Sequence, residues 1–156
     1  MSGDFAQRAR ASVEIVRRSL PPASDPVVVR DVDILRFAEA TGAETRRDPD
    51  GRLVAPPLFL PPLPPRYPLG PDGRRRDPAD RQGSGGLPNR LMAGCEVTIS
   101  APIRSGESIV VSWRLDDVVE KQGRTGPMLL ITTTAGYRTA GGEPRREERW
   151  TLVHRD

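Results

Sequence analysis

Three segments in the second half of the chain decide its fold. They read Arg90-Leu91-Met92-Ala93-Gly94-Cys95-Glu96, then Ala101-Pro102-Ile103-Arg104-Ser105-Gly106-Glu107, and then Val119-Glu120-Lys121-Gln122-Gly123-Arg124-Thr125-Gly126-Pro127-Met128. Each segment contains glycine, and the second and third also contain proline, where a strand would begin or turn. Outward from these segments, the apolar residues recur at every second position, at Ile109, Val111, Trp113 and Leu115. This period of two predicts a half-buried antiparallel strand.

Three further strand patterns surround this one. Residues 96–100 alternate until Pro102 interrupts them, and residues 128–137 are rich in β-branched residues and threonine. Gly141-Gly142 predicts a hairpin turn, after which residues 149–153 are expected to close the sheet. The second half of the chain therefore predicts an antiparallel meander.

The first half predicts two helices. Residues 5–20 carry apolar side chains at helical spacing, and Pro21-Pro22 ends the pattern. Residues 27–29 form a short β-branched run, which suits an edge strand. Asp31 is expected to cap a second helix that buries one stripe of residues and ends at Gly42. Helices followed by a meander predict the α+β class.

Residues 56–88 differ in composition from the rest of the chain. Prolines dominate the beginning of this stretch, an arginine run occupies 74–76, and a Gly-Ser-Gly-Gly run occupies 83–86. Proline removes backbone donors and prevents a continuous helix, so we expect a long exposed loop, flexible over about 61–86. The Pro-Pro-Leu-Pro-Pro run also suits a ligand for an SH3-like partner.

The length and composition restrict the classes of protein. A chain of 156 residues suits one domain, taken here as 1–156. The single cysteine, Cys95, allows no internal disulfide, and no leader or long apolar run is visible. We therefore expect a cytoplasmic protein with no membrane contact. Aromatic residues make up 4% of the chain, which argues against nucleic acid as a partner because base stacking requires them. Nearly all the cations are arginines, which suit an anionic ligand.

The three segments quoted above resemble the N-terminal hotdog of MaoC-like, fatty-acid-synthase-type dehydratases. The last stretch, residues 147–155, is similar to the final strand of that domain. The resemblance runs from about Val27 to the end and implies a single hotdog, with an antiparallel sheet wrapped around a helical element. It also implies the reaction, which is the reversible addition of water to a trans-2-enoyl thioester. Such proteins usually carry two hotdogs in tandem, and this chain has room for one.

The catalytic motif of that family is incomplete here. MaoC-type hydratases use an Asp and a His on a loop after a short helix, and this sequence reads Thr41-Gly42-Ala43-Glu44-Thr45-Arg46-Arg47-Asp48-Pro49. Ala43 stands in place of the Asp, and the loop contains no His. Glu44 is out of register, so we expect it to be solvated. The family's oxyanion donor would fall near Pro57, and proline has no N–H to donate.

Two reactive side chains elsewhere are expected to be structural. His154 is the only histidine, and its position predicts a partly exposed strand end. We expect Cys95 to be buried and to pack against other side chains, and not to act as a nucleophile. The sequence shows no cluster of metal-ligating residues at a suitable spacing, so no metal site is expected. No catalytic residue is assigned to this chain.

Four residues are the candidates for binding substrate. They are Pro57 and Leu58, beside the family's oxyanion position, and Arg124 and Gly126, in the Gly-Arg-Thr-Gly-Pro turn. Such a turn can offer a guanidinium and backbone N–H groups to a phosphate, although it also suits a plain hairpin. No cofactor is expected, because the substrate itself would carry coenzyme A or acyl carrier protein.

Three functions remain open on the sequence. The first is a non-catalytic subunit of a two-component enoyl-CoA hydratase or 3-hydroxyacyl-thioester dehydratase, a heterodimer whose partner hotdog supplies the Asp and His. The second is an acyl-CoA-binding or regulatory hotdog without catalysis. The third is a self-dimer that acts as a complete dehydratase through Glu44 or His154. A partner carrying the histidine motif would favour the first.

Overall fold

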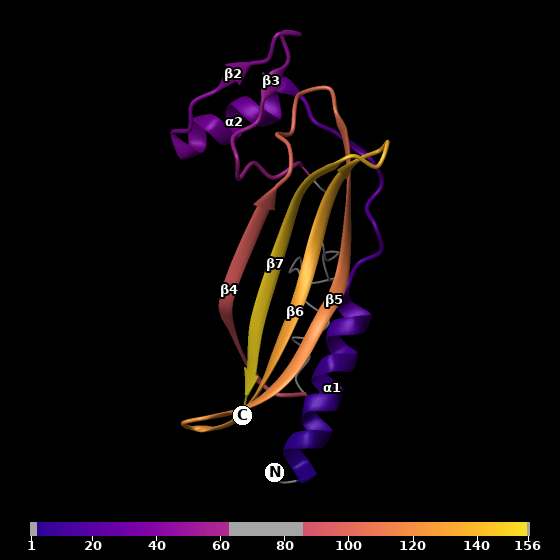
Figure 1. Cartoon of the computed structure of the whole chain (residues 1–156), viewed down its shortest axis with the longest axis vertical. Coiled ribbons are helices and arrows are strands. Elements are labelled where there is room, and N and C mark those ends of the chain that lie inside the picture. The colour runs from indigo at the N-terminus through magenta and orange to yellow at the C-terminus, as the bar shows by residue number, and fades with distance from the viewer. Residues whose placement is uncertain (1–2, 63–85, 156) are drawn as a thin grey trace, which may run out of the picture.

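The computed structural model describes residues 3–62 and 86–155 (Figure 1). One long, curled antiparallel sheet dominates it, built from β1 (Val27–Val28), β4 (Asn89–Ile99), β5 (Ser108–Gly123), β6 (Gly126–Thr139) and β7 (Pro144–Arg155). The strand order is β1-β5-β6-β7-β4. A separate small hairpin joins β2 (Arg46–Arg47) to β3 (Leu53–Val54). The predicted α+β class is confirmed.

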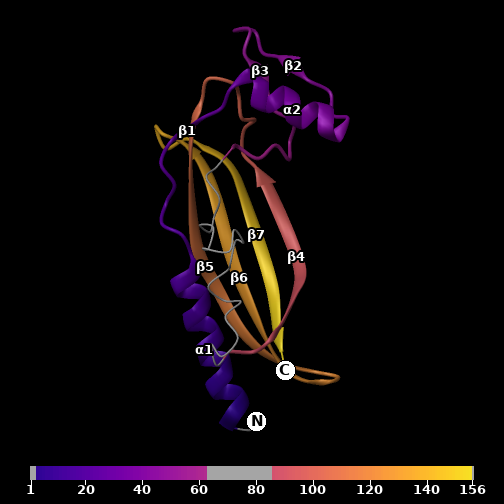
Figure 2. The same ribbon diagram turned by 180° about the vertical axis from the view of Figure 1, so that it is seen from behind.

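Two helices contact this framework at different places (Figure 2). Helix α1 (Gly3–Ser19) lies along the sheet over β5 and β6, and α2 (Asp31–Thr41) lies at one end beside β2 and β3. None of the helices within residues 3–62 and 86–155 is both long and apolar enough to cross a membrane.

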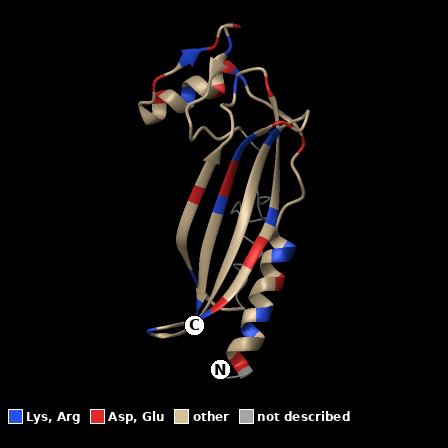
Figure 3. Cartoon of the chain, in the orientation of Figure 1, with Lys and Arg blue, Asp and Glu red and all other residues tan. Residues whose placement is uncertain are grey.

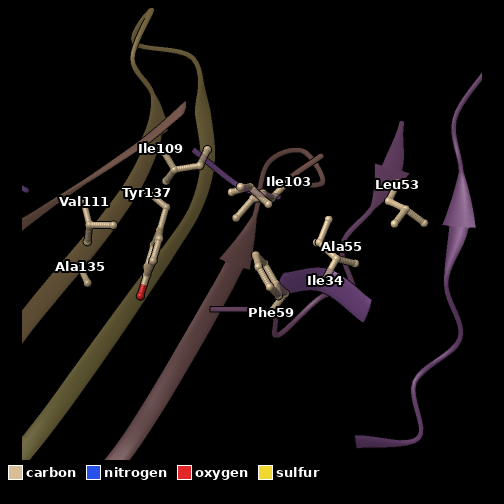
Figure 4. Packing of buried hydrophobic residues seen from close by; sticks show 10 residues of the cluster. Ile34, Leu53, Ala55, Phe59, Ile103, Ile109, Val111, Ala135 and Tyr137 are labelled. Atoms are coloured by element: carbon tan, nitrogen blue, oxygen red, sulfur yellow. The ribbon is translucent and has the colours of Figure 1, made fainter. Parts of the chain in front are cut away.

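Two apolar clusters hold these elements together. The cluster under α1 joins Phe5 and Ala9 to Leu87 and to Leu129 and Ile131 of β6. The cluster at the α2 end contains ten buried residues (Figure 4): Val29, Ile34, Leu53, Ala55, Phe59, Ile103, Ile109, Val111, Ala135 and Tyr137. The alternating residues of β5 thus face the core, as their spacing predicts.

The boundaries of α2 are as predicted, but its first turn is capped differently. Asp31 is the first helical residue, and Arg30 precedes it in an extended conformation. The backbone N–H of Arg30 donates to the Asp33 carboxylate at 3.2 Å. Asp33, and not Asp31, is therefore the side chain that caps the first turn. At the other end Gly42 adopts φ 69° and donates its N–H to the Ala38 carbonyl, the left-handed stop that was expected.

Two strands occupy other places in the sheet than the sequence suggested. The last strand, β7, does not close the sheet but lies between β6 and β4. Among the strands of residues 3–62 and 86–155, β4 forms the edge and pairs with β7 alone, and nearly all of its residues are exposed. For this reason Cys95 is exposed, and the prediction that it is buried is wrong.

The proline-rich stretch does not begin as an exposed loop. Pro56, Phe59 and Pro61 are buried, and Phe59 packs edge-on against Phe37 with ring centroids 5.7 Å apart. At the other end Leu87 belongs to the core under α1. The predicted flexibility of 61–86 and the SH3-ligand reading fall mainly on residues 63–85, outside the described residues.

Candidate functional site

A cavity of about 430 Å³ opens at the α2 end of the sheet. It lies where the segment after α2 meets the ends of β4 and β7. Its walls come from β2 and the residues before it, from β3 and the prolines after it, and from the turn after β4. The lining residues are Glu44, Thr45, Arg46, Val54, Ala55, Pro56, Pro57, Ile99, Ala101, Pro102, Ile103, Arg145 and Arg146. The loop that resembles the family's catalytic loop therefore forms one side of this cavity.

Arg146 is the most buried charged residue of the cavity wall, with 3% of its surface exposed. Its Nη1 donates to the carbonyls of Pro57, at 3.2 Å, and Phe59, at 2.8 Å. Its Nη2 forms an ion pair with Oε1 of Glu148 at 3.0 Å. The guanidinium also lies 4.3 Å from the centre of the Tyr137 ring. Arg146 thereby ties the proline segment to the sheet.

Tyr137 and Glu148 complete this buried polar group. The Tyr137 hydroxyl donates to Oε2 of Glu148 at 3.3 Å. Burial and, next, the nearby Glu148 carboxylate raise the pKa of Tyr137 above its usual range. The phenol is therefore a hydrogen-bond donor at neutral pH and does not act as a base.

Asp48, the acidic residue of the Asp-Pro pair, is fully engaged. Its carboxylate accepts hydrogen bonds from the backbone N–H groups of Asp50 and Arg52 and from the Arg52 guanidinium. Nε of Arg104 lies 3.1 Å from its Oδ2. Burial alone would raise the pKa of Asp48, but the contacts with Arg52 outweigh it and hold the pKa below its usual range. An anion held in this way is a poor proton acceptor.

A second acidic residue continues this network into the sheet. Glu107 receives two hydrogen bonds from Arg145, at 2.9 and 3.0 Å, and Arg145 also donates to Glu143. Burial would raise the pKa of Glu107, yet the Arg145 guanidinium and the Arg104 backbone hold it below its usual range. Arg145 thus lines the cavity while its positive charge is balanced by the carboxylates of Glu107 and Glu143. Figure 3 shows basic and acidic residues interspersed over α2, whereas β2 carries basic residues alone.

The cavity brings together only part of the predicted set. Pro57 lines it, and its carbonyl holds Arg146. Leu58 follows directly but is 60% exposed and does not line the cavity. Arg124 and Gly126 lie in the turn between β5 and β6, at the opposite end of the sheet. Within one chain, the two pairs of residues therefore cannot contact the same small group.

Glu44 is exposed at the cavity, as expected. His154 is not a partly exposed strand end, because only 2% of its surface is exposed. Burial, followed by the positive charge of Arg90, lowers the pKa of His154 to about 4. It lies near the end of β7, whereas the cavity is at the beginning of that strand. Cys95 is no activated thiol either, since desolvation and then Glu148 raise its pKa.

Sequence reasoning did not identify Arg146 as a site residue. Arg146 stands at one of the alternate positions of β7 whose side chains face inward. In the sheet it lies opposite Tyr137 of β6. Such a position is visible only after the two strands have been paired.

The comparisons with known proteins agree with this architecture. The model of the family described as FAS1-like, dehydratase domain region, matches residues 22–147. A chain in the crystal structure of the ChsH1-ChsH2 complex from Mycobacterium tuberculosis superposes with a TM-score of 0.59 at 22% identity, covering 97% of both chains. The MaoC-like dehydratase from Rhodospirillum rubrum gives a TM-score of 0.52 at 16% identity, covering 86% of this chain and 90% of the other. No curated protein matches the sequence.

The family match covers most of the chain, and the solved structures share its curled antiparallel sheet with two helices. The predicted hotdog fold is thus confirmed. The chain belongs to the family described as FAS1-like, dehydratase domain region.

Proposed function

We propose that the chain is the non-catalytic half of a two-component MaoC-like hydratase or dehydratase. The enzyme would add water reversibly to a trans-2-enoyl thioester, carried on coenzyme A or on acyl carrier protein. In this proposal the whole chain is one hotdog domain that shapes the thioester tunnel, and the partner hotdog supplies the catalytic Asp and His.

The state of the loop after α2 is the observation that carries the proposal. Ala43 stands where the family has its Asp, and Asp48 is engaged by Arg52 and Arg104. Glu44 lines the cavity as an exposed carboxylate, one residue away from the position of the family's Asp. The loop thus forms a wall of the cavity but offers no general base matched to the reaction.

The edge of the sheet supports the need for a partner. No strand in the described part of the chain pairs with the outer edge of β4, and this strand exposes Leu91, Met92, Val97 and Ile99, each with 38% or more of its surface accessible. A long apolar edge strand is a template for pairing with another chain. One of the similar structures is a complex of two proteins, ChsH1 and ChsH2, which agrees with a second subunit here.

The test is an activity assay with and without a partner. The purified chain should show no meaningful hydration of crotonyl-CoA, because general acid–base catalysis alone is worth about 10²–10⁴ in rate, and a missing oxyanion donor costs about a further 10²–10³. Co-expression with a hotdog subunit that carries the histidine motif should restore activity. Replacing that partner's histidine should abolish it again.

The alternatives give different results in the same assay. Turnover by the lone chain that Glu44→Gln or His154→Ala abolishes would overturn the proposal and establish a self-sufficient dimer. Thioester binding without turnover in any combination of subunits would instead indicate a binding or regulatory hotdog.

A further inference from the structure

The outer face of the sheet, turned away from the core, carries a row of aliphatic side chains that crosses four strands. Neighbouring residues of a strand alternate between the two faces, and α1 packs on the face that contains Leu129 and Ile131. Leu130, between them, therefore lies on the outer face. The sheet register continues the row on both sides of it: Val119, Leu130, Val153 and Leu91.

In the described part of the chain, no helix packs on this row. Val119, Leu130 and Val153 are half-buried among their neighbours in the sheet, and Leu91 is 50% exposed. None of the four belongs to either apolar cluster of the core. Contiguous apolar side chains on an exposed face mark a surface that contacts another molecule.

Strand β5 carries opposite charges on the two sides of the row. Asp117 precedes Val119 by two residues and Lys121 follows it by two, so the three side chains share the outer face. Both charged residues are exposed, and neither forms an ion pair within residues 3–62 and 86–155. The Asp117 carboxylate accepts the backbone N–H of Val118 at 2.8 Å, a neutral donor that leaves its charge unbalanced.

This order of charges makes the outer face complementary to a second copy of itself. A two-fold axis that lies along the row turns the second copy over and reverses its strands. Val119 then faces Val119 of the second copy, Lys121 faces Asp117, and Asp117 faces Lys121. Because a two-fold contact repeats each interaction, two pairs of opposite charge form. Arg155, the third charged residue next to the row, faces Thr151 and meets no like charge.

The size of this contact predicts a weak association. Four strands about 4.8 Å apart and three rows about 6.8 Å apart cover roughly 400 Å² on each copy. A total of roughly 800 Å² belongs to the class of weak and transient contacts. The contact uses side chains of one face, so the backbone at the outer edge of β4 stays available for pairing.

We propose that the chain self-associates weakly through the outer face, with Asp117 and Lys121 of each copy paired to Lys121 and Asp117 of the other around the aliphatic row. The molecule that covers this face is thus a second copy of the chain. The inference does not depend on the proposed function, because the catalytic partner would pair with the edge of β4.

Sedimentation equilibrium of the purified full chain, between about 5 and 500 μM, tests the contact. We expect a monomer–dimer equilibrium with a Kd of about 10–100 μM. Lys121→Asp and Asp117→Lys each place like charges opposite one another at both pairs. Each variant alone should therefore dimerise at least about tenfold more weakly. Both variants alter exposed residues, which leaves the fold intact.

Mixing these two variants separates the proposed contact from other modes of association. A mixed dimer has opposite charges at both pairs again, so an equimolar mixture should dimerise within about threefold of the original affinity. Glu120→Lys is the matched control, because it makes the same charge change as Asp117→Lys on the other face, beside α1. A mixture of Lys121→Asp and Glu120→Lys should not recover.

Val119→Thr tests the aliphatic row without changing a charge or the shape of the side chain. It should weaken dimerisation about three- to tenfold, since both copies lose an apolar contact. A chain that stays monomeric up to about 500 μM, dimerisation that neither charge reversal weakens, or equal recovery with Glu120→Lys would each overturn the proposal. An inactive assembled enzyme would overturn the proposed function and leave these sedimentation results unaffected.

Discussion

His154 is a buried imidazole whose protonation opposes folding. Its pKa in the folded chain is about 4, below the ordinary value of 6.5. As the pH falls, the unfolded chain therefore takes up this proton first, and the folded state loses stability. The stabilisation is complete above pH 6.5 and is lost between pH 6.5 and about 4.

We predict that the free energy of unfolding falls between pH 7 and pH 5 by on the order of 2 kcal/mol from this group. Urea unfolding at both pH values measures the change. His154→Leu removes the titrating group and should flatten the dependence in this range. An equally steep dependence in the variant would assign it to other groups.

Glu107 and its two neighbours allow a second prediction for single residues. Arg145 pairs with both Glu107 and Glu143, but the Glu107 side chain is 9% exposed and the Glu143 side chain is 70% exposed. Glu107→Gln leaves the buried Arg145 guanidinium with Glu143, an exposed carboxylate, as its remaining acidic partner and should cost about 3 kcal/mol of stability. Glu143→Gln, the control, should cost less than about 1 kcal/mol. Chemical denaturation distinguishes them, and equal losses would contradict the burial described here.

At the level of elements, the free edge strand β4 should govern association. Met92 on this strand is 62% exposed. Met92→Lys should weaken association with a partner at least about tenfold, because a charge would be buried at the contact. The stability of the chain alone should change by no more than about 0.5 kcal/mol.

Leu35→Lys on α2 is the control, since Leu35 is 47% exposed on another surface. Co-purification and sedimentation measure association, and thermal unfolding measures stability. Equal weakening by both variants would place the contact away from β4.

The positions of strands and helices along the chain are predictable from local patterns, but the order of the strands in the sheet is not. Alternation defines β5, and Gly42 defines the end of α2, because both depend on nearby residues alone. The order of strands depends on pairing between distant segments. Two predictions of burial are wrong because exposure follows this order: Cys95 lies on the edge strand β4, and His154 lies on the interior strand β7.

The candidate site is predictable to a similar extent. The motif order after α2 identifies Pro57, which lines the cavity, but it predicts a solvated Glu44 outside any site, whereas Glu44 lines the cavity too. Arg146 could not be identified, because its role depends on carbonyls of Pro57 and Phe59, almost ninety residues earlier in the chain. Non-local contacts of this kind leave no signal in local spacing.

For the whole molecule, the distance between the cavity and the β5–β6 turn determines what Arg124 can do. The two lie at opposite ends of the sheet. Arg124 can therefore reach a thioester only if the ligand extends along the sheet or is held largely by a partner. Arg124→Ala should weaken binding of a coenzyme A thioester to the assembled complex about five- to tenfold.

The stability of the Arg124→Ala chain should change by no more than about 0.5 kcal/mol, since the turn is exposed. Lys121→Ala, three residues earlier in the same hairpin, is the control for a general loss of positive charge. Unchanged affinity for the thioester in Arg124→Ala would assign the turn to architecture alone.

The interior place of β7 has a consequence for synthesis of the protein on the ribosome. Strand β4 emerges well before β7, yet β7 is its partner in the sheet and also joins it to β6. During translation β4 therefore stays unpaired, with its apolar side chains exposed, until residues 144–155 have been synthesised. A nascent chain stalled after β6 would present an orphan strand to chaperones and to other nascent chains, since unpaired strands promote aggregation.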